Sequence, residues 1–538
     1  MKKLLFSNDS IKIAPRIKLP QRPAVRGPAQ GLYRIVVALV VVLLPLSTQA
    51  ATWYVDNAAS GAHDGSSWSN AWNSFPSIVW GSSGVKAGDT LYISGGVTSK
   101  NYSGTLTVGA NGTSSSRITI AVDASNPAHN GVVTFDFNSL GDSAPSSTTA
   151  ITCSNNYVTI NGNVNGSPHI VIKNLRNTSD RMATYGLYGT GTTGVTIEYV
   201  AWNNCNNPIR LIHSTGFNIR YCSFMGVRGD GAVCVASSTG GFDASQIHHN
   251  SIEQLFNVYG PDGIQCTDGV SIHDNSFVVN RTTVTTSTQH PDSIQATGNY
   301  TKIYNNQFRN VGDSSIDFDC FANTTPHDFW VYNNLFLLNP ATAIDPYPEF
   351  FRLYISTSSS VGSIKNFKIL NNTFVNSGDW MAVFFKDFNG NPTSSGCEIK
   401  NNLFYNCGTS SQSPTILIGA STGFTASDWD TDGNLWYSTG STQYVSVDGT
   451  TQTTTAWVSA NEPKGMVAKP TFVNAAAEDY RPAAGARQIN AGVNLSQYFT
   501  TDATGVARPQ TGAWSIGAYE FGTGILPPSN ALIKVTVP

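Results

Sequence analysis

Apolar and polar positions between residues 247 and 404 follow one repeated phrase. Each copy is a short run of alternating apolar and polar residues, an asparagine, and then an apolar residue two positions later. The copies are IHHNSI (247–252), IHDNSF (272–277), IYNNQF (303–308), VYNNLF (331–336), ILNNTF (369–374) and IKNNLF (399–404). Alternation without a 3.6-residue period predicts β-strands. A phrase that recurs every 20–50 residues predicts stacked structural units.

The asparagines and the apolar residues after them are expected to form columns. One strand per unit cannot bury its own apolar face, so successive coils must stack on one another. Asparagine tolerates turn geometry and bonds its neighbours there, and stacked side-chain amides can bond one another in a ladder. We therefore expect Asn275, Asn306 and Asn334 to stack beside inward-facing phenylalanines, which are Phe277, Phe308 and Phe336.

These repeats resemble the right-handed parallel β-helix of the pectate-lyase-like superfamily, in which asparagine ladders lie at the bend between two sheets. The resemblance covers roughly residues 150–440 and implies an all-β solenoid of a carbohydrate-active type. The step of 38 residues between Asn334 and Asn372 predicts a loop insertion near residues 340–362. Motifs of individual subfamilies are absent, because the chain has no DD pair, no GHG, and neither the vWiDH nor the RxPxxR motif.

The two ends of the chain also resemble such proteins. The segment VKAGDTLYISGG at 85–96 is similar to the strand that starts the first coil, and the tail from Pro470 to Phe521 is similar to their C-terminal tail, with Ser515 where an aspartate is usual. We expect five parts, listed here by residue range: a signal peptide (1–50), an N-terminal cap with the first coils (51–150), β-helix repeats (151–464), a tail packing on or capping the helix (465–522), and a loose C-terminus (523–538).

The first 50 residues have the pattern of a secretory signal peptide. Residues 1–34 are basic, 35–46 are apolar but too short to span a bilayer, and small residues follow. A membrane anchor is the alternative. Removal of this segment leaves 31 − 8 = 23 basic and 34 − 1 = 33 acidic residues, a net charge near −10. We expect a secreted protein with no later membrane span, and the acidic balance argues against a nucleic-acid partner.

The cysteines do not follow a metal-binding or disulfide-dense pattern. Cys234 and Cys266 occupy similar repeat positions, from which we expect an inward, stacked pair. Cys397 and Cys407 flank one repeat and could form a disulfide in an oxidising compartment.

Three adjacent coils carry a second repeated phrase with polar groups. The copies are GPDGIQC (260–266), HPDSIQA (290–296) and GDSSIDFD (312–319). Aligning their isoleucines places Gln265, Gln295 and Asp317 in one outward column. Asp262, Asp292 and Asp319 lie nearby in the same phrases. Because neighbouring strands are about 4.8 Å apart, these groups predict a polar patch on one sheet; turn capping by aspartate is the alternative.

Further polar residues extend this column in both directions. Arg210 precedes it, and Arg352 and Lys386 follow it. The resemblance implies a polysaccharide cleft, in which Gln265, Gln295, Arg210, Tyr259 and Trp380 would bind substrate.

Three functions fit this pattern. The first is a polysaccharide lyase for uronate glycans, with Arg352 or Lys386 as base and His290 as a proton donor. In it, calcium would neutralise the substrate and be held by four aspartates, Asp262, Asp292, Asp317 and Asp319. The second is an inverting glycoside hydrolase that pairs Asp292 with Asp317 or Asp319. The third is a carbohydrate-binding or adhesion solenoid without catalysis. The oligomeric state stays open.

Overall fold

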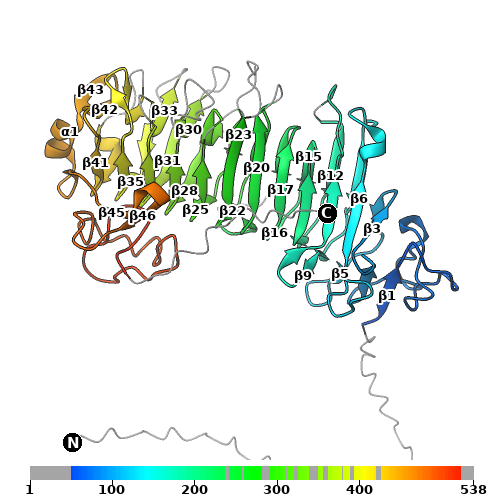
Figure 1. Cartoon of the computed structure of the whole chain (residues 1–538). Helices are drawn as coiled ribbons and strands as arrows, with labels where there is room; N and C mark the ends of the chain where they lie inside the picture. Colours follow the sequence, from blue (N-terminus) through cyan, green and yellow to red (C-terminus); the bar gives the residue numbers. More distant parts are fainter. Residues whose placement is uncertain are drawn as a thin grey trace, which may run out of the picture. The chain divides into compact units, whose positions relative to one another are not determined.

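The computed structural model describes residues 50–522, apart from short segments. Those outside the description are 1–49, 181, 237–240, 257–259, 282–290, 311, 320–324, 339–348, 356–361, 378–379, 388–392, 420–425 and 523–538. The described chain is a right-handed parallel β-helix, as the repeats predict. Three long sheets run along its length, and consecutive strands of the chain pass from sheet 1 to sheet 2 to sheet 3 (Figure 1).

Sheet 1 begins each coil. Its strands are, in spatial order, β1 (Thr52–Val55), β2 (Thr90–Ile93), β5 (Ile118–Ala121), β8 (Val158–Asn161), β13 (Thr196–Glu198), β16 (Asn218–Arg220), β19 (Ser245–His248), β22 (Val270–His273), β25 (Thr301–Tyr304), β28 (His327–Tyr332), β31 (Ser363–Leu370), β35 (Cys397–Lys400) and β40 (Trp429–Asp432), and β34 (Thr393–Ser395) pairs with β31.

Sheet 2 follows the asparagine bend. Its strands are β3 (Ser99–Tyr102), β6 (Val132–Asp136), β11 (Ile170–Lys173), β14 (Val200–Asn203), β17 (Ser223–Val227), β20 (Ser251–Phe256), β23 (Ser276–Arg281), β26 (Gln307–Arg309), β29 (Leu335–Leu337), β32 (Thr373–Val375), β36 (Leu403–Tyr405), β41 (Leu435–Tyr437) and β44 (Met466–Val467).

Sheet 3 completes the coil and carries the polar column. Its strands are β4 (Leu106–Thr107), β7 (Thr148–Thr152), β12 (Thr184–Thr190), β15 (Asn207–Ile212), β18 (Gly231–Ala236), β21 (Asp262–Cys266), β24 (Ile294–Ala296), β27 (Ser314–Asp319), β30 (Glu349–Ile355), β33 (Val383–Asp387), β39 (Ile416–Ile418), β42 (Tyr444–Val447) and the antiparallel β43 (Thr450–Thr453).

Small elements decorate the coils. They are the hairpins β9 (Asn163–Val164) with β10 (Ser167–Pro168), β37 (Thr409–Ser410) with β38 (Ser413–Pro414) and β45 (Phe472–Asn474) with β46 (Asp479–Pro482), the 3-10 turns η1 (Phe75–Ser77), η2 (Asn138–Leu140), η3 (Ala426–Asp428) and η4 (Ala475–Ala477), and the helix α1 (Thr454–Asn461). No helix among the described residues is both long and apolar enough to cross a membrane.

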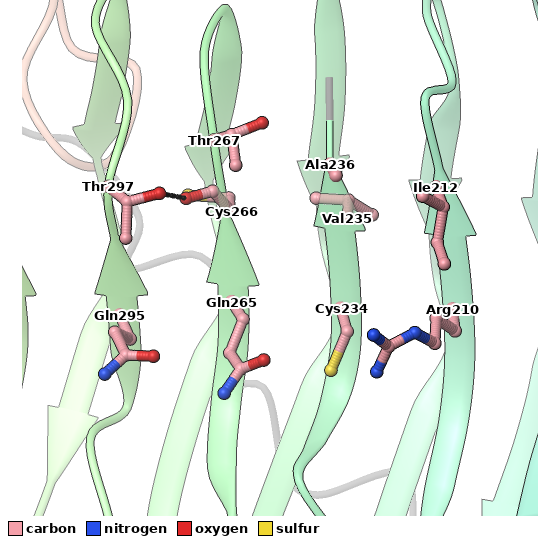
Figure 2. A pocket seen from close by; sticks show the side chains of 10 residues that line it. All are labelled: Arg210, Ile212, Cys234, Val235, Ala236, Gln265, Cys266, Thr267, Gln295 and Thr297. Carbon is pink, nitrogen blue, oxygen red and sulfur yellow. Dashed lines mark hydrogen bonds between the residues drawn. The ribbon is translucent and has the colours of Figure 1, made fainter. Parts of the chain in front are cut away.

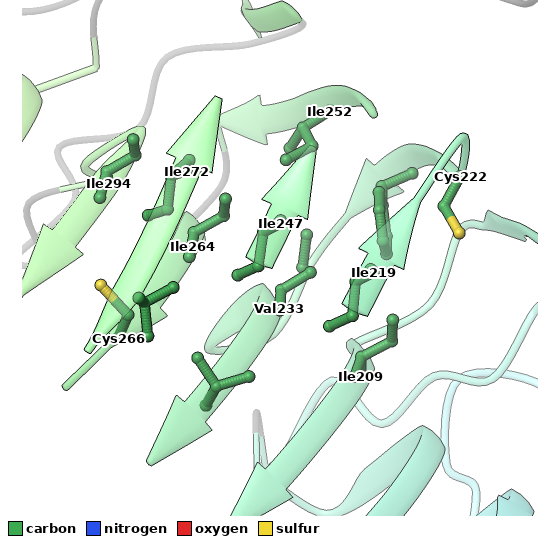
Figure 3. Packing of buried hydrophobic residues seen from close by; sticks show 14 of the residues in the cluster. Ile209, Ile219, Cys222, Val233, Ile247, Ile252, Ile264, Cys266, Ile272 and Ile294 are labelled. Atoms are coloured by element: carbon green, nitrogen blue, oxygen red, sulfur yellow. The ribbon is translucent and has the colours of Figure 1, made fainter. Parts of the chain in front are cut away.

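The core consists of aligned side chains from successive coils. Isoleucines of sheets 1 and 3 face each other across it, among them Ile247, Ile272 and Ile264 (Figure 3). Phe277, Phe308 and Phe336 are fully buried, as expected. Their rings stack in sequence with centroids 4.8 Å apart. Each ring therefore covers the face of the next, and the apolar column continues from coil to coil.

The asparagine ladder is confirmed and is longer than the six phrases. Each inner asparagine donates from Nδ2 to Oδ1 of the next over 3.0–3.1 Å, from Asn250 through Asn275, Asn306, Asn334, Asn372 and Asn402 to Asn434. Asn434 then donates to Oε1 of Glu462 over 2.9 Å. Glu462 follows α1, so this carboxyl ends the ladder where the last coils are covered.

The outer residue of each bend is held differently. His249, Asp274, Asn305 and Asn333 have positive φ values of 55–56°, a conformation in which asparagine and aspartate are enriched. Outer asparagines of the later coils bind the tail. Asn371 donates to the carbonyl of Ser515 over 3.0 Å, and Asn401 donates to the carbonyl of Val493 over 2.8 Å.

The tail is fixed by a buried arginine. Arg508, at 1 % exposed, donates to Glu520 over 3.1 Å and to Oδ1 of Asn333 over 2.9 Å. Ser515 stands where an aspartate is usual, and its carbonyl and hydroxyl oxygens bind Arg508 and Glu520, respectively. Arg508 therefore makes its ion pair with Glu520 and joins the tail to the outer residues of the bend.

The cysteine expectations are wrong in two respects. Cys234 pairs in register with Gln265, whereas Cys266 pairs with Val235. One residue of offset places two side chains on opposite faces of a strand, so only Cys266 belongs to the core cluster. Cys397 and Cys407 are both free thiols, and each is buried beside backbone carbonyls.

Candidate active site

The polar column lies on the outer face of sheet 3 in the expected register. Arg210, Cys234, Gln265, Gln295, Asp317 and Arg352 are aligned on six consecutive strands, β15 to β30. Strands alternate their side chains between two faces, so the isoleucines beside these residues fill the core and the polar side chains point away from it. The repeated phrases therefore predicted the column of Gln265, Gln295 and Asp317 correctly, whereas Cys234 was expected to face the core.

One half of the row forms an open hollow of about 220 Å³. The side chains of Arg210, Cys234, Gln265 and Gln295 lie side by side along it, with Thr267 and Thr297 in the parallel row two residues further on (Figure 2). Cys234 and Ala236 on β18 are small, and longer side chains stand on the strands either side. The hollow is thus lined by amide, hydroxyl and guanidinium groups that can bond sugar hydroxyls or a carboxylate.

The other half of the row is a cluster of acids around Arg352. Its guanidinium donates to both carboxylate oxygens of Asp317, over 2.9 and 3.1 Å, and to Asp313 over 2.5 Å. Asp292 and Glu349 lie 3.8 and 3.6 Å from it. Burial by itself would lower the pKa of Arg352, but Asp292, Asp317 and Asp313 raise it above its ordinary value. One fixed cation therefore holds these acids together.

Glu349 is an acid of this cluster that keeps its proton at neutral pH. Burial raises its pKa to about 8, against the lowering effect of Arg352, and Asp313, Asp317 and Asp292 raise it further. At neutral pH it is a protonated carboxylic acid beside carboxylates paired with Arg352. Acids whose surroundings separate their pKa values can serve as a proton donor and a proton acceptor. Glu349, the first residue of β30, was not predicted as a site residue, because it lies in none of the repeated phrases.

Asp262 and Asp292 lie deeper than an outward patch requires. Asp292 is 0 % and Asp262 5 % exposed. Oδ1 of Asp262 accepts from the backbone N–H of Asp292 over 2.8 Å, and Oδ1 of Asp292 accepts from that of Ser314 over 3.0 Å. Each aspartate therefore secures the start of the next strand of sheet 3, and the structure supports turn capping for this pair more than contact with a substrate.

The four aspartates expected to hold calcium do not fit that ion. Both oxygens of Asp317 accept from Arg352, and the oxygens of Asp262 accept from the N–H of Asp292 and, over 2.8 Å, from Gln265. Calcium needs six to eight oxygen ligands, but these oxygens already face N–H donors. The guanidinium supplies the positive charge where a metal ion would otherwise be required, and Asp319, at 2 % exposed, adds no accessible ligand.

The remaining expected residues are distributed more widely. The backbone of Lys386 pairs with Tyr354, and Tyr354 pairs with Asp319. Lys386 therefore lies two residues beyond the row, in which Phe384 follows Arg352, and its side chain lies outside the description. Trp380 is half-buried in the turn before β33, where its carbonyl accepts from Gly408. Tyr259 and His290 lie outside the described residues. Thus the backbone brings Arg210, Gln265, Gln295, Asp317 and Arg352 into one row, and Asp292 joins them from the preceding turn.

No family model matches this chain, and no curated protein matches its sequence. Solved structures with a similar chain path include the pectate lyase Pel9A, at 14 % identity over 87 % of this chain and 96 % of that one, with a TM-score of 0.47. XylC, solved with xylose, has 9 % identity over 88 % and 98 % of the two chains and a TM-score of 0.47. The polysaccharide lyase Pedsa3628 from Pseudopedobacter saltans has 10 % identity over 71 % and 89 %, with a TM-score of 0.44.

Proposed function

We propose that the protein cleaves a polysaccharide that lies across the strands of sheet 3, from the hollow at Arg210 to the acidic cluster at Arg352. The observation that carries this proposal is Glu349, whose pKa of about 8 leaves it protonated at neutral pH beside the carboxylates of Asp313 and Asp317. Breaking a glycosidic bond requires a proton for the leaving oxygen. Glu349 is the group that can supply it.

Hydrolysis with retention is the reaction that the described residues favour. Solvent reaches the side chains of Asp313 and Glu349, at 16 % and 10 % exposed, more readily than those of Asp292 and Asp317. One nitrogen of Arg352 lies 2.5 Å from Asp313 and 3.6 Å from Glu349, so the two carboxyls are closer than the about 6.5–9.5 Å that inversion requires. Glu349 would protonate the glycosidic oxygen while Asp313, oriented by Arg352, attacks the anomeric carbon, and water activated by Glu349 would then release the sugar from Asp313.

The sequence predicted a catalytic pair formed by Asp292 and either Asp317 or Asp319. Glu349 and Asp313 take the place of that pair, because the carboxylates of the predicted residues are almost fully buried.

β-Elimination on a uronate polymer is the second candidate. Arg352 is a poor base for it, because the guanidinium is paired with two carboxylates and its pKa is raised. Lys386, whose backbone is level with Asp319, would be the base. Arg210 favours an acidic sugar, since it lines the hollow and its contact with Asp230 is long, at 3.8 Å. Calcium has no part in either proposal.

The domain boundaries of the chain and its secretion remain proposals that rest on the sequence. Residues 1–50 would direct secretion and be removed, and residues 523–538 would form a loose end. A secreted chain would meet extracellular polysaccharide, which agrees with the proposed activity.

The experiment is to incubate the purified protein with pectate, alginate, glycosaminoglycan and neutral glycans, and to measure reducing ends and ultraviolet absorbance together. Hydrolysis gives reducing ends without absorbance, whereas β-elimination adds an absorbing C4–C5 double bond. We expect reducing ends alone from at least one glycan, unaffected by a chelator. Absorbance that rises with the reducing ends would transfer the assignment to the lyase and Lys386. Binding without any product would leave a carbohydrate-binding solenoid.

A further inference from the structure

A cluster of three histidines lies on the side of the β-helix at the bend between sheets 1 and 2. His248 ends β19, His249 is the outer residue of the same bend, and His273 ends β22 on the next coil. One ring nitrogen of each lies within 4.8 Å of those of the other two. The cluster belongs to a different face from the row on sheet 3 and has no part in the proposed cleavage.

Two consecutive coils each contribute a pair of donor atoms. Nδ1 of His248 and Nδ1 of His249 are 2.8 Å apart, and Nδ1 of His273 and Oδ2 of Asp274 are 2.7 Å apart. The rings of His248 and His273 stack with centroids 4.7 Å apart, because these residues are in register on adjacent strands. The second pair therefore lies directly beside the first, so three imidazoles come together and Asp274 is hydrogen-bonded to one of them.

The local backbone explains why both histidines of the first pair reach the same place. His249 has φ of 56° and Asp274 has φ of 55°. Neighbouring side chains on a regular strand point to opposite faces, but the left-handed turn brings His249 back toward His248. The later coils have asparagine at this outer position, in Asn305 and Asn333. The imidazole at 249 is thus a departure from the repeat.

A small hollow adjoins the cluster. It has a volume of about 60 Å³ and is lined by His249, Asp274 and Asn305 among others. Oδ1 of Asn305 is buried, and it has no hydrogen-bond partner in the part of the chain that the structure describes. A polar cavity of this size can hold a water molecule or an ion with polar partners. The hollow therefore reaches the cluster through His249 and Asp274, although His248 and His273 do not line it.

The charge of the cluster is compatible with a cation. Nε2 of His248 lies 3.1 Å from Oδ1 of Asn218, so Nδ1 is the ring nitrogen of His248 that faces His249. Asp274 supplies a negative charge. Arg220 is the nearby cation, and it is paired with Glu198 over 2.6 Å, which reduces its repulsion.

We propose that His248, His249 and His273 bind one late first-row transition-metal ion, with zinc as the chemical type, and that Asp274 orients His273 through their hydrogen bond. Three imidazoles with a fourth position left for water suit tetrahedral zinc and contain none of the soft ligands that select copper(I). Ligands of tetrahedral zinc lie about 3.3 Å from one another, given a metal–nitrogen distance of about 2.0–2.1 Å. The pair at 2.8 Å therefore has to open slightly as the metal replaces the proton between the two rings.

Binding would join two neighbouring coils at a point where the tail also approaches. Ala503 and Tyr519 of the tail line the same hollow. A metal that binds the folded chain and has no preformed site in the unfolded one adds its binding free energy to stability. We therefore expect a structural role and a higher unfolding temperature with metal.

The test is titration of the untagged, metal-free full chain with Zn²⁺ by calorimetry and with Co²⁺ by visible absorption. We expect one ion per chain and the intense band of tetrahedral Co²⁺. His249→Asn is the informative variant, because asparagine occupies the equivalent outer position at Asn305 and Asn333 and preserves the turn. We expect this variant to bind the metal at least about tenfold more weakly, with an unchanged unfolding temperature in the absence of metal.

His327→Asn is the matched control. His327 contacts Asp328 over 2.8 Å as His273 contacts Asp274, but it belongs to no cluster of three ligating groups among the described residues. The His327→Asn variant should therefore bind metal as the wild type does. Absence of stoichiometric binding would overturn the proposal. So would binding that His249→Asn leaves intact, because the ion would then be held elsewhere, for instance by the acids of sheet 3.

Discussion

At the scale of single residues, the acids of the cluster around Arg352 differ in their surroundings. Glu349 and Asp317 both lie against Arg352, but Asp317 receives two of its N–H groups whereas Glu349 lies 3.6 Å away. Burial raises the pKa of Glu349 to about 8, and Arg352 lowers it too little to offset this effect. Glu349 therefore keeps its proton at neutral pH, and its role follows from its burial.

Replacement of Glu349 by glutamine tests this role through pH. The folded pKa of about 8 lies above the ordinary unfolded value of about 4.3. The group therefore favours the folded state fully below about pH 4.3, and this contribution is lost as pH rises to about 8. We expect the free energy of unfolding of the wild type to fall across that window more steeply than that of Glu349→Gln. Equal slopes in urea unfolding at several pH values would contradict the assignment.

Removal of one charge of the cluster should be costly. Asp317→Asn removes the two-pronged partner of Arg352 but leaves Asp313 paired with it, so the expected cost is that of lost hydrogen bonds to a charged group, about 1.5–3 kcal/mol. We expect a loss of this size in chemical unfolding. Asp430→Asn is a control, because its carboxylate pairs with Lys400 at the surface with 65 % of the side chain exposed, where pairs contribute about 0–1 kcal/mol. Equal effects of the two changes would show that the Arg352 cluster is not effectively buried.

At the scale of elements, the bend between sheets 1 and 2 performs two tasks with two adjacent residues. The inner asparagine carries the ladder, and the outer residue adopts the left-handed turn and contacts the tail in later coils. The repeated Asn-Asn pair of the sequence corresponds to these two roles. The ladder of inner asparagines could be predicted, because it follows from the repeat. The partners of the outer residues could not be predicted, because they lie in the tail, more than 90 residues later in the chain.

Asn334→Ala should destabilise the helix strongly. Its side chain accepts from the backbone and the amide of Asn306 and donates to Asn372 and to the carbonyl of Ile303. Each buried group left without a partner costs about 1–3 kcal/mol, so we expect a loss of several such increments in urea unfolding. Asn57→Ala, at an exposed hydrogen bond, should have little effect. A small loss at Asn334 would mean that water replaces the ladder.

At the scale of the whole molecule, the regular coils were predictable and the irregular parts were not. The stacking of Phe277 on Phe308 and the row from Gln265 to Asp317 follow from side-chain alternation and repeat length alone. Glu349 was not predicted because no repeated phrase contains it. Cys234 was assigned to the core because two similar phrases differ by one residue in register, which reverses the face of the strand. Lys386 was displaced by two residues for a related reason, since the similar phrases EFFRLY and VFFKDF pair with Arg352 opposite Phe384 and not opposite Lys386.

The tail provides a prediction at this scale. Arg508 is buried and joins Glu520 to Asn333 of the helix. Arg508→Ala would leave a buried carboxylate unpaired and remove a contact between tail and coils. We expect amide hydrogen exchange to accelerate across residues 470–521 while the strands around the Asn250–Asn334 ladder stay protected. Loss of protection throughout the chain would instead show that tail and coils unfold as one unit.

The central claim is that Glu349 donates the proton when a polysaccharide is cleaved on sheet 3. The most direct measurement is the rate of reducing-end release by the wild type, Glu349→Gln and the exposed control Glu478→Gln on whichever glycan the protein cleaves. Loss of a general acid lowers kcat by about 10²–10⁴-fold, and we expect this for Glu349→Gln, with an unchanged control. We also expect wild-type activity to decline as pH rises through about 8. Retention of full activity by Glu349→Gln in a folded protein would contradict the claim.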